Sequence, residues 1–350
     1  MKFLITGASG FLGKRVVDAA LRRGHSVRAV VRPAFDSKRL GWPDQVELCR
    51  RDLRRREGLA DALQGVDCVL HLAAGVKGDD HERFIATVVT TENLLNAMAD
   101  SEVRKLVLIS SFSVYDYGHL KGSLDEQSPV LTAEGDLYER DGYAIAKVWQ
   151  ERITREMAEK HGWQLCILRP GFIWGPGNEE LAGVGYSLGP LFFRVMGGKR
   201  LPLTFVDNAA DAIIQAAETD AAYGETINLV DSEGESPTAY DRQYRRWVGR
   251  RGPSIPWPYF LGMVQARIAK TISRLLFGKH GKLPGIIVPA RFAARFKPLR
   301  FSTDKLRSVL SWQPPVPLAE AFLKTFSIPI AHKQPSDRPA SATPHDIRSV

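Results

Sequence analysis

Three side chains of this sequence have the types and spacing needed for proton transfer at a carbon-bound oxygen. Tyr143 and Lys147 lie four residues apart in a stretch of helical periodicity, so both project from one helix face, one turn apart. A phenol with a pKa of about 10 is a poor base at neutral pH, and a neighbouring ammonium favours its phenolate form. Ser111 follows an apolar run typical of a strand, and its hydroxyl could donate to the same oxygen. We therefore predict Tyr143 as the acid–base, Lys147 as the group that lowers the pKa of Tyr143 and holds ribose hydroxyls, and Ser111 as the group that polarises the oxygen.

A glycine-rich segment near the amino terminus is typical of a phosphate-binding turn. It follows a short apolar run and precedes a helical pattern. Without side chains, Gly7 and Gly10 let a pyrophosphate approach the backbone, Gly13 lets the helix approach the sheet, and the helix amino terminus offers N–H donors. This context predicts a nicotinamide dinucleotide site. Its expected members in this segment are Gly7, Ser9, Gly10, Phe11, Leu12 and Gly13.

Further cofactor contacts are expected where the next strands end. Asp52 and Leu53 follow the third expected strand, and Ala73, Ala74 and Gly75 follow the fourth. In a parallel sheet these ends meet at one edge, beside the point where the strand order reverses. We expect adenine and ribose to lie there.

The end of the second expected strand bears on the choice between NAD and NADP. An acid that binds the ribose 2′-hydroxyl of NAD should stand there, but the chain has Val31 and Arg32, with Arg28 nearby. A guanidinium forms bidentate bonds to phosphate oxygens and suits a 2′-phosphate. NADP(H) is therefore favoured, and NAD(H) stays possible if Arg32 is only a solvated loop residue and Asp36 reaches the ribose.

The elements that must position these residues follow from the hydrophobic pattern. Short apolar runs alternate with longer amphipathic stretches over the first 170 residues, which is typical of βαβ units in a doubly wound parallel sheet of the Rossmann type. The expected strands are residues 2–6, 26–31, 46–50, 68–73, 105–110 and 164–169, and the expected helices are 11–23, 58–64, 81–99 and 143–161.

The second half of the chain is less regular. Residues 203–217 predict a strand followed by a helix, and 225–230 another strand. We expect a dinucleotide-binding domain of residues 1–175 and 201–232, and a smaller, mostly helical substrate domain of residues 176–200 and 233–333. The Pro-, Ser- and Asp-rich residues 334–350 predict a disordered tail.

The net charge of +9 is concentrated in one segment. Residues 241–300 carry fourteen Lys and Arg against the single acid Asp241. Within this segment one helical face is apolar and the basic side chains lie opposite, which predicts either a helix on an anionic membrane surface or an ordinary substrate-domain helix. The apolar face comprises Phe260, Leu261, Val264, Ile268, Ile272 and Leu275, and the basic group is Arg267, Lys270 and Arg274. Peripheral membrane contact through residues 260–300 is thus one expectation.

Other features limit the protein's environment and partners. Cys49, Cys68 and Cys166 are far apart and show no Cys-x-x-Cys spacing, so we expect neither a disulfide framework nor a metal site. The apolar start is too short for a signal peptide, and no run of apolar residues could span a bilayer. We expect a cytoplasmic protein, with a homodimer left open. No nucleic-acid reading module accompanies the basic segment, so the expected partner is a small-molecule substrate.

Taken together, the glycine segment, Ser111 and the Tyr143 to Lys147 spacing resemble the extended short-chain dehydrogenase/reductase superfamily, within its NAD-dependent epimerase/dehydratase family. Residues 168–176, 205–212 and 301–314 look like further segments of that family. The resemblance covers residues 1 to about 330. It implies that Pro170, Gly171 and Ile173 border the nicotinamide, and that residues 205–231 return to the main domain.

Departures from the family pattern narrow the activity. Phe112 and Ser113 stand where sugar-nucleotide dehydratases carry Asp and Glu, and no Cys is near for the branch that epimerises beside a ketone. Leu201 and Pro202 replace the Arg-Asp pair that sugar-nucleotide members use around the diphosphate. Thr87 replaces an Asn, which puts supporting hydrogen bonds around the active site in doubt.

The hypothesis that best fits these departures is an NADP(H)-preferring oxidoreductase acting on a secondary alcohol or ketone of a lipophilic, sterol-like substrate. It is similar to the 3β-hydroxysteroid dehydrogenase branch of the family, whose members have a membrane-associated segment in this region. One alternative is a nucleotide-sugar epimerase with a retained dinucleotide. Another is a non-catalytic dinucleotide-binding protein, against which the intact Ser, Tyr and Lys argue.

Overall fold

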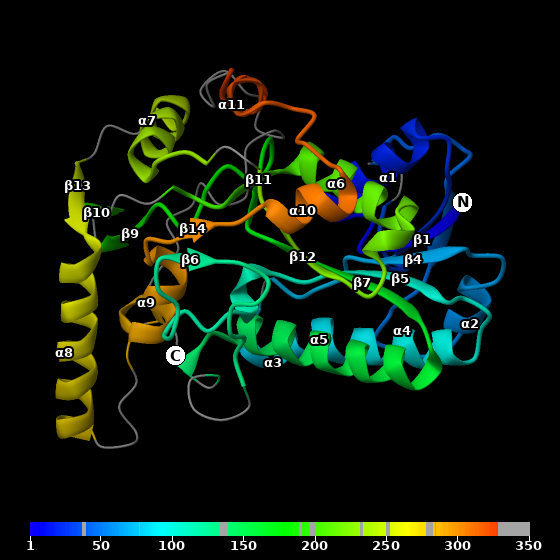
Figure 1. The fold of residues 1–350 in the computed structure, drawn as a ribbon, viewed down its shortest axis with the longest axis horizontal. Helices are drawn as coiled ribbons and strands as arrows, with labels where there is room; N and C mark the ends of the chain where they lie inside the picture. The colour runs from blue at the N-terminus through cyan, green and yellow to red at the C-terminus, as the bar shows by residue number, and fades with distance from the viewer. Residues whose placement is uncertain are drawn as a thin grey trace.

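A computed structural model describes residues 1–36, 40–76, 78–132, 137, 139–188, 191–196, 200–231, 234–249, 253–277, 283 and 285–327. The expected tail, 334–350, lies outside these residues. The described chain forms a large α/β half at one end and a smaller half at the other, as Figure 1 shows.

A seven-stranded sheet in the order β3-β2-β1-β4-β5-β7-β12 organises the larger half. Every pairing in it is parallel, and the order reverses between β1 and β4. The strands are β1 (Lys2–Thr6), β2 (Ser26–Val31), β3 (Glu47–Arg50), β4 (Cys68–His71), β5 (Lys105–Ile109), β7 (Gln164–Pro170) and β12 (Thr226–Leu229). The predicted doubly wound parallel sheet is therefore confirmed.

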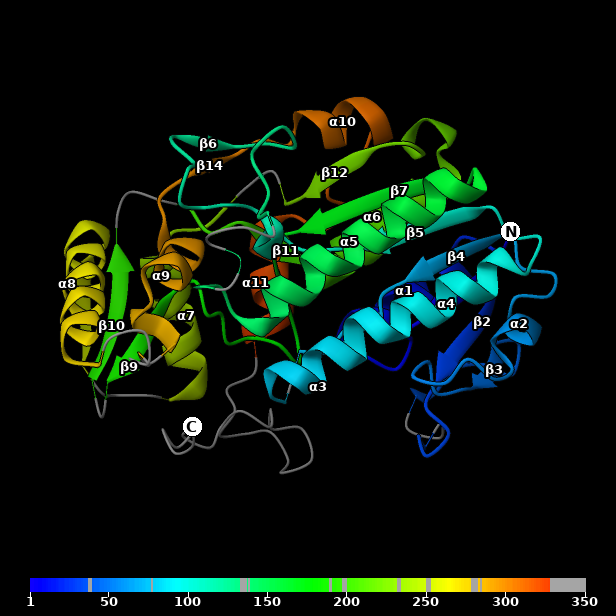
Figure 2. The same cartoon turned by 90° about the horizontal axis from the view of Figure 1, so that it is seen from below.

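Helices cover both faces of this sheet, because its strands are apolar on both sides. One face carries α1 (Phe11–Arg22) and α6 (Val206–Glu218), and the other carries α4 (Thr90–Ala99) and α5 (Gly142–His161), as Figures 1 and 2 show. The short α2 (Leu59–Ala62) packs with α4. The helix expected over 81–99 is interrupted: α3 (Asp80–Phe84) passes through a π-helical turn, residues 85–89, before α4 begins.

The smaller half contains a sheet as well as helices. Strand β10 pairs antiparallel with β9 and parallel with β13, so a small three-stranded sheet accompanies the helices that make up most of this region. Three helices pack around it at the end of the molecule remote from the amino terminus (Figure 2). The elements are β9 (Gly185–Leu188), β10 (Leu191–Met196), α7 (Pro237–Val248), β13 (Ser254–Pro258), α8 (Tyr259–Phe277) and α9 (Pro289–Phe296).

The end of the described chain returns to the larger half. Strand β14 (Arg300–Phe301) pairs with β6 (Ser123–Leu124). In α10 (Asp304–Leu310), Leu306 and Leu310 pack into the core that α1 and α6 share, although the sequence placed this segment in the substrate domain. The final helix is α11 (Leu318–Phe326), and two further short strands, β8 (Phe172–Trp174) and β11 (Leu203–Phe205), pair beside the main sheet.

Candidate active site

The residues predicted to carry chemistry gather at the carboxyl edge of the main sheet. Gly7 follows β1, Ala73 follows β4, Ser111 follows β5 and Gly171 follows β7. Because these strands are parallel neighbours around the point where their order reverses, the four loops open on the same side.

The glycine segment has the close contacts that a phosphate-binding turn requires. Gly7 has a left-handed φ of 68°, and a Cβ there would lie 3.0 Å from the Ala73 backbone nitrogen. A Cβ on Gly13 would lie 2.1 Å from the Gly7 carbonyl oxygen, so only glycine lets α1 start this close to the turn. Gly10 caps α1 without a side chain, and no acid stands in the first turn. This cradle fits an anionic pyrophosphate.

Helix α5 delivers Tyr143 and Lys147 to the same edge. Asp141 begins the helix by accepting a hydrogen bond from the Ala144 backbone nitrogen at 3.0 Å, which puts Tyr143 in the first turn. One turn later, the Lys147 Nζ lies 6.0 Å from the centroid of the Tyr143 ring. A hydrogen bond with Ser111 lowers the pKa of Tyr143, so the structure brings all three predicted residues together.

The electrostatics of this group differ from the sequence expectation. Burial raises the pKa of Tyr143 to about 12, against the lowering effect of Ser111, and the Asp141 carboxylate raises it further. Burial also lowers the pKa of Lys147 to about 7, while Glu151 opposes that shift. The protein alone therefore favours a neutral phenol. A positively charged nicotinamide ring and the amino-terminal dipole of α5 would both favour the phenolate.

Adjacent serines at the end of β5 have different tasks. Ser110 is buried and donates to Glu151 Oε1, which also accepts from Arg169 Nε at 2.9 Å. The ion pair joins β7 to α5, and the Ser110 hydrogen bond adds the end of β5. Ser111 accepts a hydrogen bond from the Ser113 backbone nitrogen at 3.1 Å, so its single hydroxyl proton points to partners inside the site, of which the Tyr143 phenol is one.

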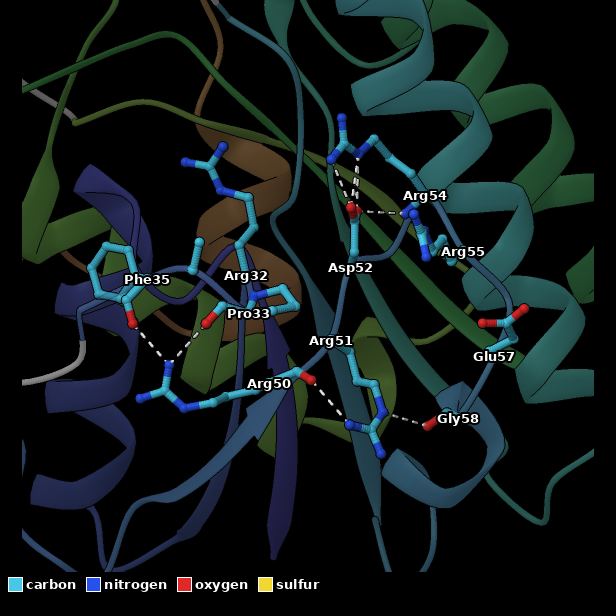
Figure 3. A pocket seen from close by; sticks show the side chains of 11 residues that line it. Arg32, Pro33, Phe35, Arg50, Arg51, Asp52, Arg54, Arg55, Glu57 and Gly58 are labelled. Atoms are coloured by element: carbon cyan, nitrogen blue, oxygen red, sulfur yellow. Dashed lines mark hydrogen bonds and ion pairs between the residues drawn. The ribbon is translucent and has the colours of Figure 1, made fainter.

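An open pocket of about 910 Å³ lies where β2 and β3 end (Figure 3). It brings together the predicted Arg32 and Asp52. Asp52 forms an ion pair with Arg54 at 2.6 Å, and hydrogen bonds from that guanidinium lower the pKa of the carboxyl. Arg50 braces the loop after β2 by donating to the Phe35 carbonyl oxygen at 2.8 Å.

The sequence analysis did not predict that arginine side chains would line this pocket so densely. Besides Arg32, the pocket is lined by Arg50, Arg51, Arg54 and Arg55. The run of five arginines between residues 50 and 56 was the available signal. Because this segment begins at the last residue of β3, which pairs with the end of β2, it lies at the carboxyl edge of the main sheet.

Arg28 and Leu53, which the sequence analysis named near the cofactor, are not among the residues that line this pocket. Arg28 is buried in β2, where its Nε donates to Glu47 at 2.6 Å, so it braces the sheet rather than facing the pocket. The Leu53 side chain lies in the core, and its carbonyl oxygen accepts from Asn93 Nδ2 at 2.9 Å. Only the backbone of Leu53 is suited to a place in the cofactor edge.

The loops after β4 and β7 are held closely against their neighbours. The Gly75 backbone nitrogen donates to Thr87 Oγ1 at 2.9 Å, so the threonine that replaces the family's Asn supports this loop. Ala73 and Ala74 are half-buried beside it. A Cβ on Gly171 would lie 2.3 Å from the Pro202 carbonyl oxygen. Pro170 ends β7, and Ile173 lies in β8 beyond that turn.

Within the part of the chain that the structure describes, no cluster of His, Cys, Asp and Glu could hold a metal ion. The described helices also include none with the length and hydrophobicity to cross a bilayer.

The chain is similar to known proteins. Residues 3–229 match the model described as the NAD dependent epimerase/dehydratase family. The chain is 30% identical over 281 residues to the 3 beta-hydroxysteroid dehydrogenase/Delta 5→4-isomerase of Mycobacterium tuberculosis, covering 73% of this chain and 74% of that protein. It is 26% identical over 351 residues to 3beta-hydroxysteroid-dehydrogenase/decarboxylase isoform 2 of Arabidopsis thaliana, covering 92% of this chain but only 61% of that relative's length.

Solved structures show the same fold. The UDP-glucose 4-epimerase of Thermus thermophilus, in complex with NAD, matches with a TM-score of 0.66 and 21% identity, over 93% of this chain and 98% of that one.

Proposed function

Because the chain belongs to the NAD-dependent epimerase/dehydratase family and is an oxidoreductase of the extended short-chain dehydrogenase/reductase type, we propose that it oxidises a secondary alcohol, or reduces the ketone, of a sterol-like substrate. The observation that carries this proposal is the convergence of Ser111, Tyr143 and Lys147 beside the glycine turn. A non-catalytic binding protein would not need these three groups together.

Each residue has a role in the proposed reaction. In the oxidative direction, the substrate hydroxyl proton passes to the phenolate oxygen of Tyr143 as the C–H bond breaks and a ketone forms. The bound dinucleotide supplies the hydride acceptor. Ser111 donates a hydrogen bond to the substrate oxygen and keeps its proton. Two N–H groups of the Lys147 ammonium donate to the Ile109 carbonyl oxygen and to Gln150 Oε1. The third can donate to the ribose or to the phenol.

Two observations favour a lipophilic substrate over a nucleotide sugar. Leu201 and Pro202, where sugar-nucleotide members carry Arg-Asp, are buried. The neighbouring Arg200 donates to the Gly234 carbonyl oxygen at 2.7 Å, and Lys199 lies outside the described residues. The named relatives from M. tuberculosis and A. thaliana are hydroxysteroid dehydrogenases.

The cationic pocket supports a preference for NADP(H). Figure 3 shows no interaction between the Arg32 guanidinium and the other side chains drawn, whereas Arg54 is engaged by Asp52. An anion with several oxygens is better suited than a ribose hydroxyl to a pocket that Arg32, Arg51 and Arg55 also line. The ribose 2′-phosphate of NADP(H) is such an anion.

The outer surface of α8 supports peripheral contact with an anionic membrane. The helix buries its small Ala266 and Ser273 and packs Met263 against the core, but leaves seven large apolar side chains exposed, with Leu275 at 80% and Leu276 at 69%. The exposed apolar set, which we call the α8 strip, is Phe260, Leu261, Val264, Ile268, Ile272, Leu275 and Leu276. An apolar strip on a basic segment is suited to the headgroup region of an anionic bilayer.

A turnover assay tests the proposed reaction. The protein is mixed with NADP⁺ and pregnenolone, a 3β-hydroxysteroid, or with UDP-glucose, and reduced nicotinamide is followed by absorbance. We expect net reduction with the steroid only. Interconversion of UDP-glucose with no net absorbance change, by protein that purifies with dinucleotide bound, would instead establish the epimerase.

A further inference from the structure

A buried chain of hydrogen bonds links Lys147 to the residue that precedes the glycine turn. Lys147 Nζ donates to Gln150 Oε1 at 2.8 Å, and Gln150 Nε2 donates to Thr91 Oγ1 at 2.8 Å. Thr91 Oγ1 lies 2.8 Å from His71 Nε2, and His71 Nδ1 lies 2.6 Å from Thr6 Oγ1. All five side chains are buried, so water does not compete for these bonds. The chain crosses from α5 through α4 to the ends of β4 and β1.

The proton positions in this chain follow from its fixed ends. Thr91 has one hydroxyl proton, and it goes to the Thr87 carbonyl oxygen at 2.6 Å because a carbonyl can only accept. Thr91 Oγ1 must therefore accept from His71, which puts the imidazole proton on Nε2. The unprotonated Nδ1 then accepts a hydrogen bond from the Thr6 hydroxyl.

The remaining contacts complete the chain at the cofactor edge. Thr6 Oγ1 accepts from the backbone nitrogens of Leu72 and Ala73 at 3.2 and 3.3 Å, so it holds the loop after β4 against the end of β1. At the other end, Lys147 Nζ also donates to the Ile109 carbonyl oxygen at 2.7 Å. Two of the three ammonium protons are thus fixed by protein acceptors, which leaves one direction for the third.

We propose that Gln150, Thr91 and His71 are positioning residues that aim the third N–H of Lys147 into the active site and fix its place relative to the glycine turn. None of them touches the reacting atoms. This inference rests on the proposed function, because it assigns Lys147 a task at the dinucleotide and at Tyr143. Burial, together with the charge of Lys147, lowers the pKa of His71 to about 3, which agrees with a neutral ring.

A matched pair of variants tests whether Thr91 helps to position Lys147. Thr91→Val removes the acceptor shared by Gln150 and His71. Thr90→Val is the control. Thr90 is also buried in α4 and also donates to a carbonyl one turn earlier, that of Ala86 at 2.9 Å, but it takes no part in the series of hydrogen bonds from Lys147 to Thr6. We expect Thr91→Val to raise the Kd for NADPH and lower kcat with pregnenolone, each by roughly tenfold or more. We expect Thr90→Val to change either value less than about twofold.

A second readout does not depend on turnover. In ¹⁵N-labelled protein, the His71 ring should show a protonated Nε2 and an unprotonated Nδ1, with no titration between about pH 5 and 8. In Thr91→Val the Nε2 signal should shift, and in Thr90→Val it should not. A proton on Nδ1, or equal effects of the two substitutions on NADPH binding, would overturn the inference.

The positioning role of Thr91 and the proposed reaction can be disproved separately. If Thr91→Val and Thr90→Val behave alike while Tyr143→Phe abolishes turnover, the positioning role is wrong and the proposed reaction stands. If Tyr143→Phe keeps full turnover, the proposed reaction is wrong whatever the tautomer of His71.

Discussion

The Lys147 ammonium lies 6.0 Å from the centroid of the Tyr143 ring and at the same time donates to the Ile109 carbonyl oxygen at 2.7 Å. The lysine is therefore held beside the phenol by the end of β5. Its charge is costly in this buried place, which is why its pKa falls to about 7.

This depressed pKa predicts a specific dependence of stability on pH. The unfolded chain keeps its lysine protonated up to about pH 10.4, whereas folded Lys147 releases its proton near pH 7. Between these values the unfolded state binds more protons at this residue, so the contribution of Lys147 to stability should rise with pH over that window. In urea unfolding, the free energy of the wild type minus that of Lys147→Met should therefore increase with pH there. A difference that stays constant with pH would contradict the shift.

A second buried group predicts the opposite sign. Burial raises the pKa of Asp231 to about 7, and its Oδ2 accepts from the Phe205 backbone nitrogen at 2.8 Å. Folded Asp231 holds a proton that the unfolded chain loses above about pH 4, so the group costs stability increasingly as pH rises from 4 to 7. Asp231→Asn should match the wild type near pH 4 and exceed its free energy of unfolding at pH 8 by on the order of 2 kcal/mol. A variant less stable at pH 8 than at pH 4, relative to wild type, would contradict this.

The cationic pocket predicts which arginine reads the cofactor phosphate. Arg32→Ala should raise the Kd for NADPH by roughly tenfold or more, because a charge-assisted bond to phosphate contributes about 1.5–3 kcal/mol. Binding of NADH should change little. Arg56→Ala is the control, since Arg56 pairs with Asp100 at 2.9 Å away from the pocket. Fluorescence titration measures both constants, and an equal loss for NADPH and NADH in Arg32→Ala would argue against NADP(H).

The α8 strip predicts binding to lipid vesicles. Replacing Leu275 and Leu276 by Asp should abolish cosedimentation with phosphatidylserine-containing vesicles, because it puts two charges on the apolar face. Leu323→Asp is the matched control, because Leu323 is 67% exposed on α11 and lies outside the strip. If wild-type protein fails to sediment with these vesicles, or if the control loses binding as completely, the strip does not contact membrane.

Much of the fold could be predicted from the hydrophobic pattern of the sequence. Strands β1 and β2 begin and end at the predicted residues, and α5 differs from its predicted range by one residue, because buried parallel strands are continuous apolar runs and Gly162 stops the helix in a left-handed conformation. The π-helical turn before α4 was not predictable, since its residues have ordinary helical spacing. The assignment of α10 was missed because Leu306 and Leu310 show an apolar face but not the surface against which it packs.

The candidate site shows the same division. Spacing and strand ends were enough to bring Ser111, Tyr143 and Lys147 together. The supporting residues His71 and Gln150 were missed because their hydrogen bonds join elements far apart in sequence. The pKa of Tyr143 was expected to fall and instead rises, because burial cannot be read from residue spacing.

The central claim is that the Tyr143 phenol exchanges a proton with the substrate oxygen. Steady-state turnover of pregnenolone with NADP⁺ by Tyr143→Phe tests it most directly, with NADPH affinity measured in parallel to show that the site is intact. We predict a loss in kcat of at least roughly a hundredfold with the Kd for NADPH within about twofold of wild type. Turnover at the wild-type rate by this variant would contradict the account.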